Sequence, residues 1–166
     1  MPERVMSDYF RLFNEIGIIG QLSRTLLEAR LPPGFVMAQF SVLNHLVRVG
    51  DGRTPLAIAQ AFQVPKNSMT HSLTVLEREG LIDLRPNPQD GRSKLVFITD
   101  AGRVFRENVI AAFAPDIARI AAAFPPDHVA RLLPDLERLR KILDADREGE
   151  ARPTSAPGRA GDAQPV

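Results

Sequence analysis

The feature that most constrains this chain is a change in hydrophobic period between residues 80 and 99. On either side of it, apolar residues recur at three- and four-residue spacing, which is typical of amphipathic helices. Within it, residues 81–85 and 94–98 have a period near two and are predicted to be strands. The six residues Pro86–Gly91 between them are dense in turn formers. The pattern predicts a long-tipped β-hairpin set in a helical chain.

Turn and capping residues divide the remaining chain into helices. The expected order is four helices, two strands and two helices, so the expected fold class is mainly α with a small β-hairpin. The predicted helices are residues 5–29, a second that carries Phe40 to Val47 and ends at Gly50, a third from Thr54 to about Phe62, a fourth from Pro65 to Gly80, a fifth that is capped by Thr99 and continues to Phe124, and a last one from Asp127 onward.

The third and fourth helices are short and joined by a tight link, the pattern of a helix-turn-helix. Their apolar residues (Ile58, Ala59, Phe62, Val64, Met69, Leu73 and Leu76) are expected to pack against each other. The outward residues of the fourth helix are then small, polar or basic: Lys66, Asn67, Ser68, Thr70, His71 and Thr74. Such a face suits the major groove of DNA, where side chains can read base edges. The alternative is a polar helix face that only contacts solvent.

The hairpin that follows predicts a wing. Its tip carries Arg92 and Lys94, and an arginine at such a tip suits the narrow, negative minor groove. Asp90 lies two residues before Arg92, and we expect its carboxylate to orient the guanidinium by a bidentate pair. The alternative is an exposed turn whose charges are merely solvated.

Taken in order, these motifs resemble the MarR family of winged helix-turn-helix transcriptional regulators over Phe40 to Thr99. The resemblance rests on QFSVL at 39–43, IA at 58–59 with Val64, LEREGLI at 76–82, DGRSK at 90–94 and ITDAG at 98–102. It implies a recognition helix over Pro65–Glu79 and a wing arginine at Arg92 supported by Asp90. Three positions depart from the family pattern: Gln63 in the turn, Pro65 in place of a capping residue, and Leu84, beside which Arg85 is expected to contact DNA.

The resemblance also implies a two-fold dimer that is held together by interlocking terminal helices. The expected organisation is an N-terminal dimerisation helix (1–30), a winged helix-turn-helix DNA-binding domain (34–99), C-terminal dimerisation helices (100–146) and a disordered tail (147–166). The long apolar stripes over residues 9–27 and 105–143 agree with a dimer, although they could instead complete a monomer core. Recognition helices set about 34 Å apart would require a pseudo-palindromic operator.

Relatives in this family suggest a small aromatic effector between the dimerisation helices and the winged domain. The residues that could contact it are Tyr9, Phe13, Met37, Phe40, His45 and Phe113, and each would also serve in ordinary packing. The chain has no cysteine, which excludes a thiol-oxidation switch, disulfides and thiolate metal sites. The three histidines lie on different predicted helices, so no metal site and no cofactor are expected.

The predicted function is that of a homodimeric, sequence-specific DNA-binding regulator, acting as a repressor in the cytoplasm. Its expected partners are double-stranded DNA, a second copy of the chain and a small aromatic effector, with no membrane. The net charge is only +1, so attraction to DNA must come from local charge. The alternative is a winged-helix protein-interaction module that does not read DNA. An enzyme is not expected, because no Gly-rich phosphate loop, GxSxG elbow or paired-carboxylate site is present in the sequence.

Overall fold

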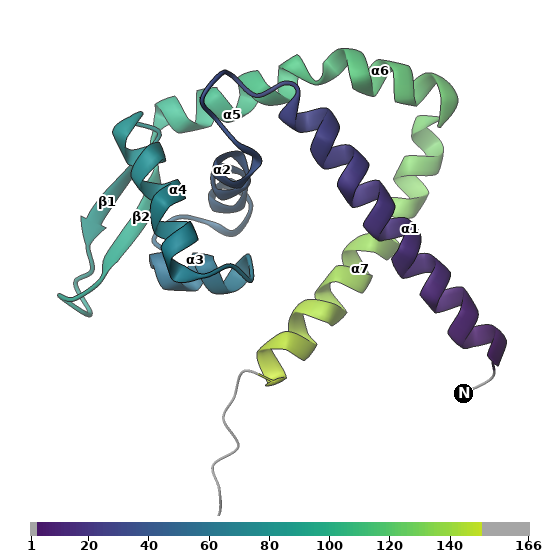
Figure 1. Ribbon diagram of the computed structural model, residues 1–166, viewed down its shortest axis with the longest axis horizontal. Coiled ribbons are helices and arrows are strands. Elements are labelled where there is room, and N and C mark those ends of the chain that lie inside the picture. Colours follow the sequence, from purple (N-terminus) through teal and green to yellow (C-terminus); the bar gives the residue numbers. More distant parts are fainter. Residues whose placement is uncertain (1–2, 151–166) are drawn as a thin grey trace, which may run out of the picture. The chain divides into compact units, whose positions relative to one another are not determined.

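The architecture is mainly helical with one small antiparallel sheet, as predicted (Figure 1). The computed structural model describes residues 3–150, with side chains through Ala145. It divides after Ala118 into two units, which are treated separately below. The elements are α1 (Glu3–Glu28), α2 (Met37–Val49), α3 (Pro55–Ala61), α4 (Lys66–Arg78), β1 (Ile82–Pro86), β2 (Lys94–Ile98), α5 (Asp100–Ala112), α6 (Ala114–Ala123) and α7 (Pro126–Glu150).

The segment predicted as one helix from Thr99 to Phe124 is two helices. α5 ends at Ala112, Phe113 forms its C-cap, and α6 begins at Ala114. Pro115 explains the break, because it has no backbone N–H to donate to the preceding turn and its ring disfavours helical geometry at the residue before it. The apolar stripe runs on across this break, which is why periodicity alone predicted a continuous helix.

The hairpin, called the wing below (residues 82–98), pairs in register from Ile82 opposite Ile98 to Pro86 opposite Lys94. A third segment joins it through an isolated antiparallel bridge between Arg53 and Val96. The N–H of Val96 donates to the carbonyl of Arg53, and the N–H of Gly52 donates to the carbonyl of Val96, both at 2.9 Å. The chain leading into α3 is therefore tied directly to the wing.

One hydrophobic core holds α2, α3, α4 and the wing together (Figure 1). Leu43 of α2, Ile58 of α3 and Leu76 of α4 are fully buried, and Val96 closes the core from the wing. Val64 was predicted on the packing side but is exposed; its contribution to the turn is its backbone N–H, which donates to the Ala59 carbonyl at 3.1 Å. Burial of these side chains is the main stabilising term for the helix-turn-helix.

The two predicted threonine caps are confirmed. The Thr54 hydroxyl accepts from the N–H of Ala57 at 3.2 Å, with Pro55 at the first helical position of α3. The Thr99 hydroxyl accepts from the N–H of Gly102 at 3.0 Å and donates to the Gly80 carbonyl at 2.8 Å. A single hydroxyl thus links the start of α5 to the turn in which α4 ends.

Polar contacts hold α5 against α2. The Asp51 carboxylate accepts from the N–H of Ile98 at 2.9 Å and from the Arg103 guanidinium at 3.1 Å. One turn further along α5, Arg106 Nε donates to Asn44 Oδ1 at 3.0 Å. These bonds fix the first half of α5 on the winged core.

An ion pair between a partly exposed arginine and a buried carboxylate connects the chain after α1 to α6. Arg30 Nε, just after α1, lies 2.7 Å from Asp116 Oδ2 in the first turn of α6. Asp116 is only 8% exposed, and a carboxylate at that depth needs a charged partner to offset its loss of hydration. The pair therefore holds the chain after α1 against the start of α6.

The second unit consists mainly of α7, which continues through Pro134 to Glu150. Two ion pairs between residues four apart lie on its polar side. Arg131 Nη2 lies 3.0 Å from Asp127 Oδ2, and Arg140 Nη1 lies 2.9 Å from Asp144 Oδ2. Residues 147–150 of the predicted disordered tail belong to α7, and 151–166 lie outside the described residues. No helix in the described part of the chain is both long enough and apolar enough to cross a membrane.

We predict that Gly102→Ala destabilises the protein by about 2–3 kcal/mol. A Cβ at this position would lie 2.1 Å from the Leu81 carbonyl oxygen and 2.8 Å from a side-chain carbon of Ile98. The measurement is the urea unfolding midpoint at fixed protein concentration. Gly91→Ala is the matched control, because its Cβ would meet nothing within 4 Å. Equal stability of Gly102→Ala and wild type would contradict this close approach.

His45 of α2 lies in a half-buried position against Phe62, with ring centroids 5.2 Å apart. Burial lowers the pKa of its imidazole, and the positive charges of Arg48 and Arg53 lower that pKa further. The unfolded chain therefore binds a proton on this histidine at a higher pH than the folded chain does. Stability contributed by neutral His45 is present above a pH of about 6.5 and is lost as the pH falls toward the lower folded value.

We predict that His45→Phe loses less stability than wild type when the pH falls from about 7.5 to about 5.5. Phenylalanine preserves the ring contact with Phe62 and removes the titrating group. Urea unfolding midpoints of both proteins at the two pH values test this, with His71→Gln, which removes an exposed imidazole, as the control. Identical losses in wild type and His45→Phe would exclude His45 as the source.

Candidate nucleic-acid interface

α4 separates its apolar and polar faces as the sequence predicts. Met69, Ser72, Leu73 and Leu76 are buried against the core. The six outward residues are all exposed: Lys66, Asn67, Ser68, Thr70, His71 and Thr74. No acidic residue occurs between Lys66 and Thr74, so this half of α4 offers donors, acceptors and one positive charge to a partner.

The two outward threonines on α4 have their hydroxyl protons already engaged. Thr70 Oγ1 donates to the Lys66 carbonyl and Thr74 Oγ1 donates to the Thr70 carbonyl, each at 2.9 Å. A hydroxyl has one proton and two lone pairs, so both oxygens face outward as acceptors. In this rotamer the two threonines suit a base amino group better than a phosphate oxygen, which needs a donor.

The turn that leads into α4 is tight and strained. Gln63 has a positive φ of 52°, a conformation that side chains other than glycine and asparagine seldom adopt. The departure from the family pattern at this position therefore places glutamine in left-handed backbone. Pro65 is the N-cap of α4 and supplies no side-chain hydrogen bond, so the helix begins without a side-chain cap.

The wing tip is shaped by bonds between side chains and backbone. Asp90 Oδ1 accepts from the backbone N–H of Arg92 at 3.0 Å, and Asn87 Oδ1 accepts from the N–H of Gln89 at 3.0 Å. Asn87 Nδ2 also donates to the Ser93 hydroxyl at 2.8 Å across the base of the tip. Both acceptors form turns of the type that asparagine and aspartate favour.

The predicted bidentate pair between Asp90 and the Arg92 guanidinium is wrong. The carboxylate bonds to the Arg92 backbone, because an aspartate two residues before an N–H can close a turn without ordering a long side chain. Within residues 3–145 the Arg92 side chain is exposed and enters no ion pair, and the same holds for Lys94. Both positive charges are therefore available to a partner.

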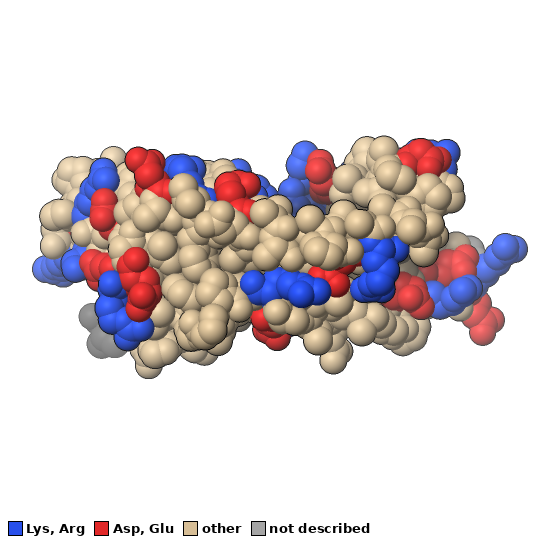
Figure 2. Space-filling model, turned by 90° about the horizontal axis from the view of Figure 1, so that it is seen from above, with Lys and Arg blue, Asp and Glu red and all other residues tan. Residues whose placement is uncertain are grey.

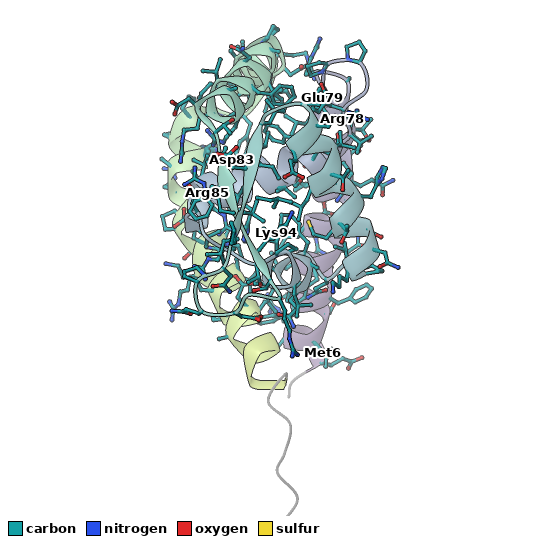
Figure 3. All side chains as sticks on the ribbon, turned by 90° about the vertical axis from the view of Figure 1, so that its left-hand side faces the viewer. Met6, Arg78, Glu79, Asp83, Arg85 and Lys94 are labelled. Atoms are coloured by element: carbon teal, nitrogen blue, oxygen red, sulfur yellow. The ribbon has the colours of Figure 1, made fainter. Side chains whose placement is uncertain are left out.

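Arg85 differs from these two cations. Its guanidinium lies 4.4 Å above the ring of Phe97 on the neighbouring strand and 3.1 Å from Asp83 Oδ2. Figure 3 shows Asp83 and Arg85 close together on β1, with Arg78 and Glu79 at the far end of α4. The charge of Arg85 is partly neutralised by its own strand, so it is a weaker candidate for DNA contact than Arg92 or Lys94.

A hollow of about 410 Å³ lies beside the wing, here called the Arg53 hollow. Residues 52–54 and Ala57 line one side, and residues 87–89 and Leu95 line the other. Arg53 is not among the site residues that the sequence predicts. The β-bridge between Arg53 and Val96 involves a single residue pair and produces no hydrophobic periodicity. The sequence pattern therefore does not indicate that Arg53 lies beside the wing.

Charge over the rest of the surface is mixed. Figure 2 shows basic and acidic side chains interspersed over one face, with uncharged stretches between them. This agrees with a net charge of +1. Attraction to a polyanion thus depends on the local cations of α4 and the wing.

The residues predicted to contact an effector occupy dissimilar environments. Tyr9 and Phe13 are exposed on α1, whereas Phe40 is buried in α2. Met37, His45 and Phe113 are half-buried at the start of α2, within α2 and at the C-cap of α5. None of the six lines the Arg53 hollow.

A helix-turn-helix with an exposed polar second helix, followed by a basic-tipped hairpin, defines a winged helix-turn-helix protein. A family model described as the MarR family matches residues 34–93. The chain is 33% identical over 104 residues to the multiple antibiotic resistance protein MarR of Escherichia coli, covering 58% of this chain and 72% of that protein. It therefore belongs to the MarR family of winged helix-turn-helix transcriptional regulators.

Two further relatives extend this similarity. The transcriptional activatory protein BadR of Rhodopseudomonas palustris is 26% identical over 152 residues, covering 88% of this chain and 85% of BadR. The crystal structure of a mutant Escherichia coli MarR complexed with operator DNA has a TM-score of 0.61 and 26% identity, covering 80% of this chain and 95% of that one. The resemblance thus includes the terminal helices as well as the winged core.

We predict that Asp90→Ala loosens the wing tip, whereas Asp90→Asn preserves it. The asparagine oxygen can still accept from the Arg92 N–H, and alanine cannot. Amide hydrogen exchange at Arg92 and Ser93 measures the effect, with faster exchange expected for alanine only. Faster exchange in both variants would show that the negative charge, rather than the acceptor, maintains the tip.

Proposed function

We propose that this protein is a homodimeric regulator that binds a specific, pseudo-palindromic DNA duplex. The observation that carries the proposal is that the polar face of α4 from Lys66 to Thr74 holds no acidic residue and lies beside two wing cations that make no ion pair within residues 3–145. One core holds both elements. In this proposal Lys66, Asn67, Ser68, Thr70, His71 and Thr74 face the major groove. Arg92 enters the neighbouring minor groove, and Lys94 contacts backbone phosphates with a smaller contribution from Arg85.

Four of the six residues on α4 fall into two chemical roles. Lys66 at the start of the helix suits a phosphate or a guanine edge, and Asn67 can make a bidentate contact with adenine. Thr70 and Thr74 present acceptors, as shown above, which suits the amino groups of adenine or cytosine. The structure of the Escherichia coli relative with operator DNA supports this placement by analogy of fold.

Exposed apolar surface supports a homodimer. α1 contains no buried residue, although it carries several large apolar side chains, among them Phe10 at 71% exposed. Ile117 of α6 and Leu132 and Leu133 of α7 are also exposed. Apolar faces of this kind on a soluble domain mark an interface, and a two-fold dimer would cover the same face on both copies.

We propose that a small aromatic effector modulates this dimer through Tyr9, Phe13, Met37, His45 and Phe113. Phe40 is buried in α2, so it would support the effector site by packing in the core and would not contact the effector directly. Such an effector can change the population of the DNA-binding state only if it binds one arrangement of the two winged helix-turn-helix domains of the dimer more tightly than the other. Affinity for a duplex selected from a random pool, measured with and without salicylate or benzoate, tests this.

We propose repression as the outcome of binding. A bound dimer that spans two successive turns of duplex excludes polymerase wherever its site overlaps a promoter. BadR bears the name of an activatory protein, so the position of the site relative to the promoter decides the sign. A reporter driven by the protein's own upstream region measures that sign directly.

We predict that Arg92→Ala weakens binding to a duplex selected from a random pool by about tenfold and lowers the salt slope by about 0.9. The exposed Arg92 makes no ion pair within residues 3–145, so its replacement removes a free charge and leaves the core intact. Titrations at several salt concentrations measure both quantities, and sedimentation confirms that the variant keeps the wild-type oligomeric state.

Arg78→Ala is the matched control. This arginine is equally basic but is already paired with Glu79 at 2.9 Å, so its loss should leave affinity near wild type. Recovery of no preferred duplex by wild type would contradict the proposed function and favour the protein-interaction module. Unchanged affinity in Arg92→Ala would exclude the wing arginine from the interface.

A further inference from the structure

We propose that the Arg53 hollow binds a phosphate of the DNA backbone, with Arg53 as its cation. The inference rests on the proposed function and adds a contact by Arg53, which belongs to neither the recognition helix nor the wing. It would position the duplex rather than read its sequence.

The location of the hollow carries the first part of the argument. One wall is the segment that leads into α3 and opens the helix-turn-helix, and the other is the tip of the wing at residues 87–89 with Leu95 of β2. A helix in the major groove and a wing in the adjacent minor groove must straddle the sugar–phosphate strand that separates the two grooves. Surface between the helix-turn-helix and the wing therefore faces that strand.

The chemistry of the lining carries the second part. Arg53 is the charged residue among the eight that line the hollow, and no carboxylate faces it there. Its guanidinium makes a 3.5 Å contact with the Val49 carbonyl and enters no ion pair within residues 3–145. Asn87 and Gln89 line the opposite wall, and their side chains carry amide N–H groups, one of which donates to the Ser93 hydroxyl. A cation with two amide donors across from it suits an anion that carries several acceptor oxygens.

The hollow is also preorganised. The two backbone bonds between residues 52–53 and Val96 hold Arg53 against β2, and the bond from Asn87 to Ser93 fixes the other wall. The positive charge of Arg53 also affects a residue on α2, because it contributes to lowering the pKa of His45. A phosphate entering the hollow would meet a field that no protein carboxylate in its lining opposes.

The test compares Arg53→Gln with wild type on the duplex recovered from the random pool and on a shuffled duplex of the same length. We expect binding to weaken about threefold to tenfold on both duplexes and the salt slope to fall by about 0.9, because a phosphate contact acts on every sequence alike. Arg53→Lys, which keeps the charge, should preserve the slope. Arg48→Gln is the matched control, because Arg48 is also exposed and also acts on His45 but does not line the hollow.

Each result decides the inference. Unchanged slope in Arg53→Gln, together with weaker binding by Arg92→Ala, would overturn the phosphate site and leave the proposed function standing. An equal loss in Arg48→Gln would also overturn it, because the effect would then be one of general charge. Saturable binding of inorganic phosphate without DNA, lost in Arg53→Gln, would assign the hollow to a free anion instead. Failure of wild type to bind any duplex would overturn both proposals.

Discussion

The structure depends on one close approach, where the first turn of α5 packs on the junction between α4 and β1. Gly102 permits it, since any Cβ there would overlap the Leu81 carbonyl. The Thr99 hydroxyl holds the same junction from the other side, bonding to both Gly80 and Gly102. The end of the recognition helix, the first wing strand and α5 therefore meet in one joint. A close-packed joint of this kind has few intermediate arrangements.

This joint limits how the protein can switch. A change in the tilt of α5 cannot leave α4 in place, because Thr99 and Gly102 bind both sides of the junction. The helix-turn-helix and wing are then expected to move as one rigid head. The Arg30–Asp116 pair sits at the opposite end of the first unit, where the chain after α1 meets α6. Regulation of the proposed dimer would consequently change the distance between two intact winged helix-turn-helix units. It would not alter the conformation of the DNA-facing surface of either unit.

Local signals made much of the fold predictable. Thr54 and Thr99 act within three residues of themselves, so capping is legible without tertiary information. The outward face of α4 was also predictable, because a 3.6-residue period assigns each side chain to a face. The α5–α6 break was missed because the apolar stripe outweighed the local effect of Pro115. The bond from Asp90 to the Arg92 backbone is local turn chemistry that hydrophobic periodicity does not report. The place of Arg53 beside the wing depends on a contact between segments far apart in the sequence.

The small number of free cations has a consequence for how such a head would recognise DNA. Non-specific binding comes almost entirely from neutralised phosphates, and here the free charge near α4 and the wing is confined to a few side chains. Each head alone would thus hold arbitrary duplex weakly. A second head bound to the adjacent half-site would double the number of phosphate contacts. Both half-sites would then have to match, so the specificity ratios of the two heads would multiply. If the acceptors of Thr70 and Thr74 face the groove as proposed, discrimination would rest on base edges and on the spacing of half-sites more than on charge. Dimerisation through the exposed faces of α1, α6 and α7 would on this argument be a condition for specificity as well as for solubility.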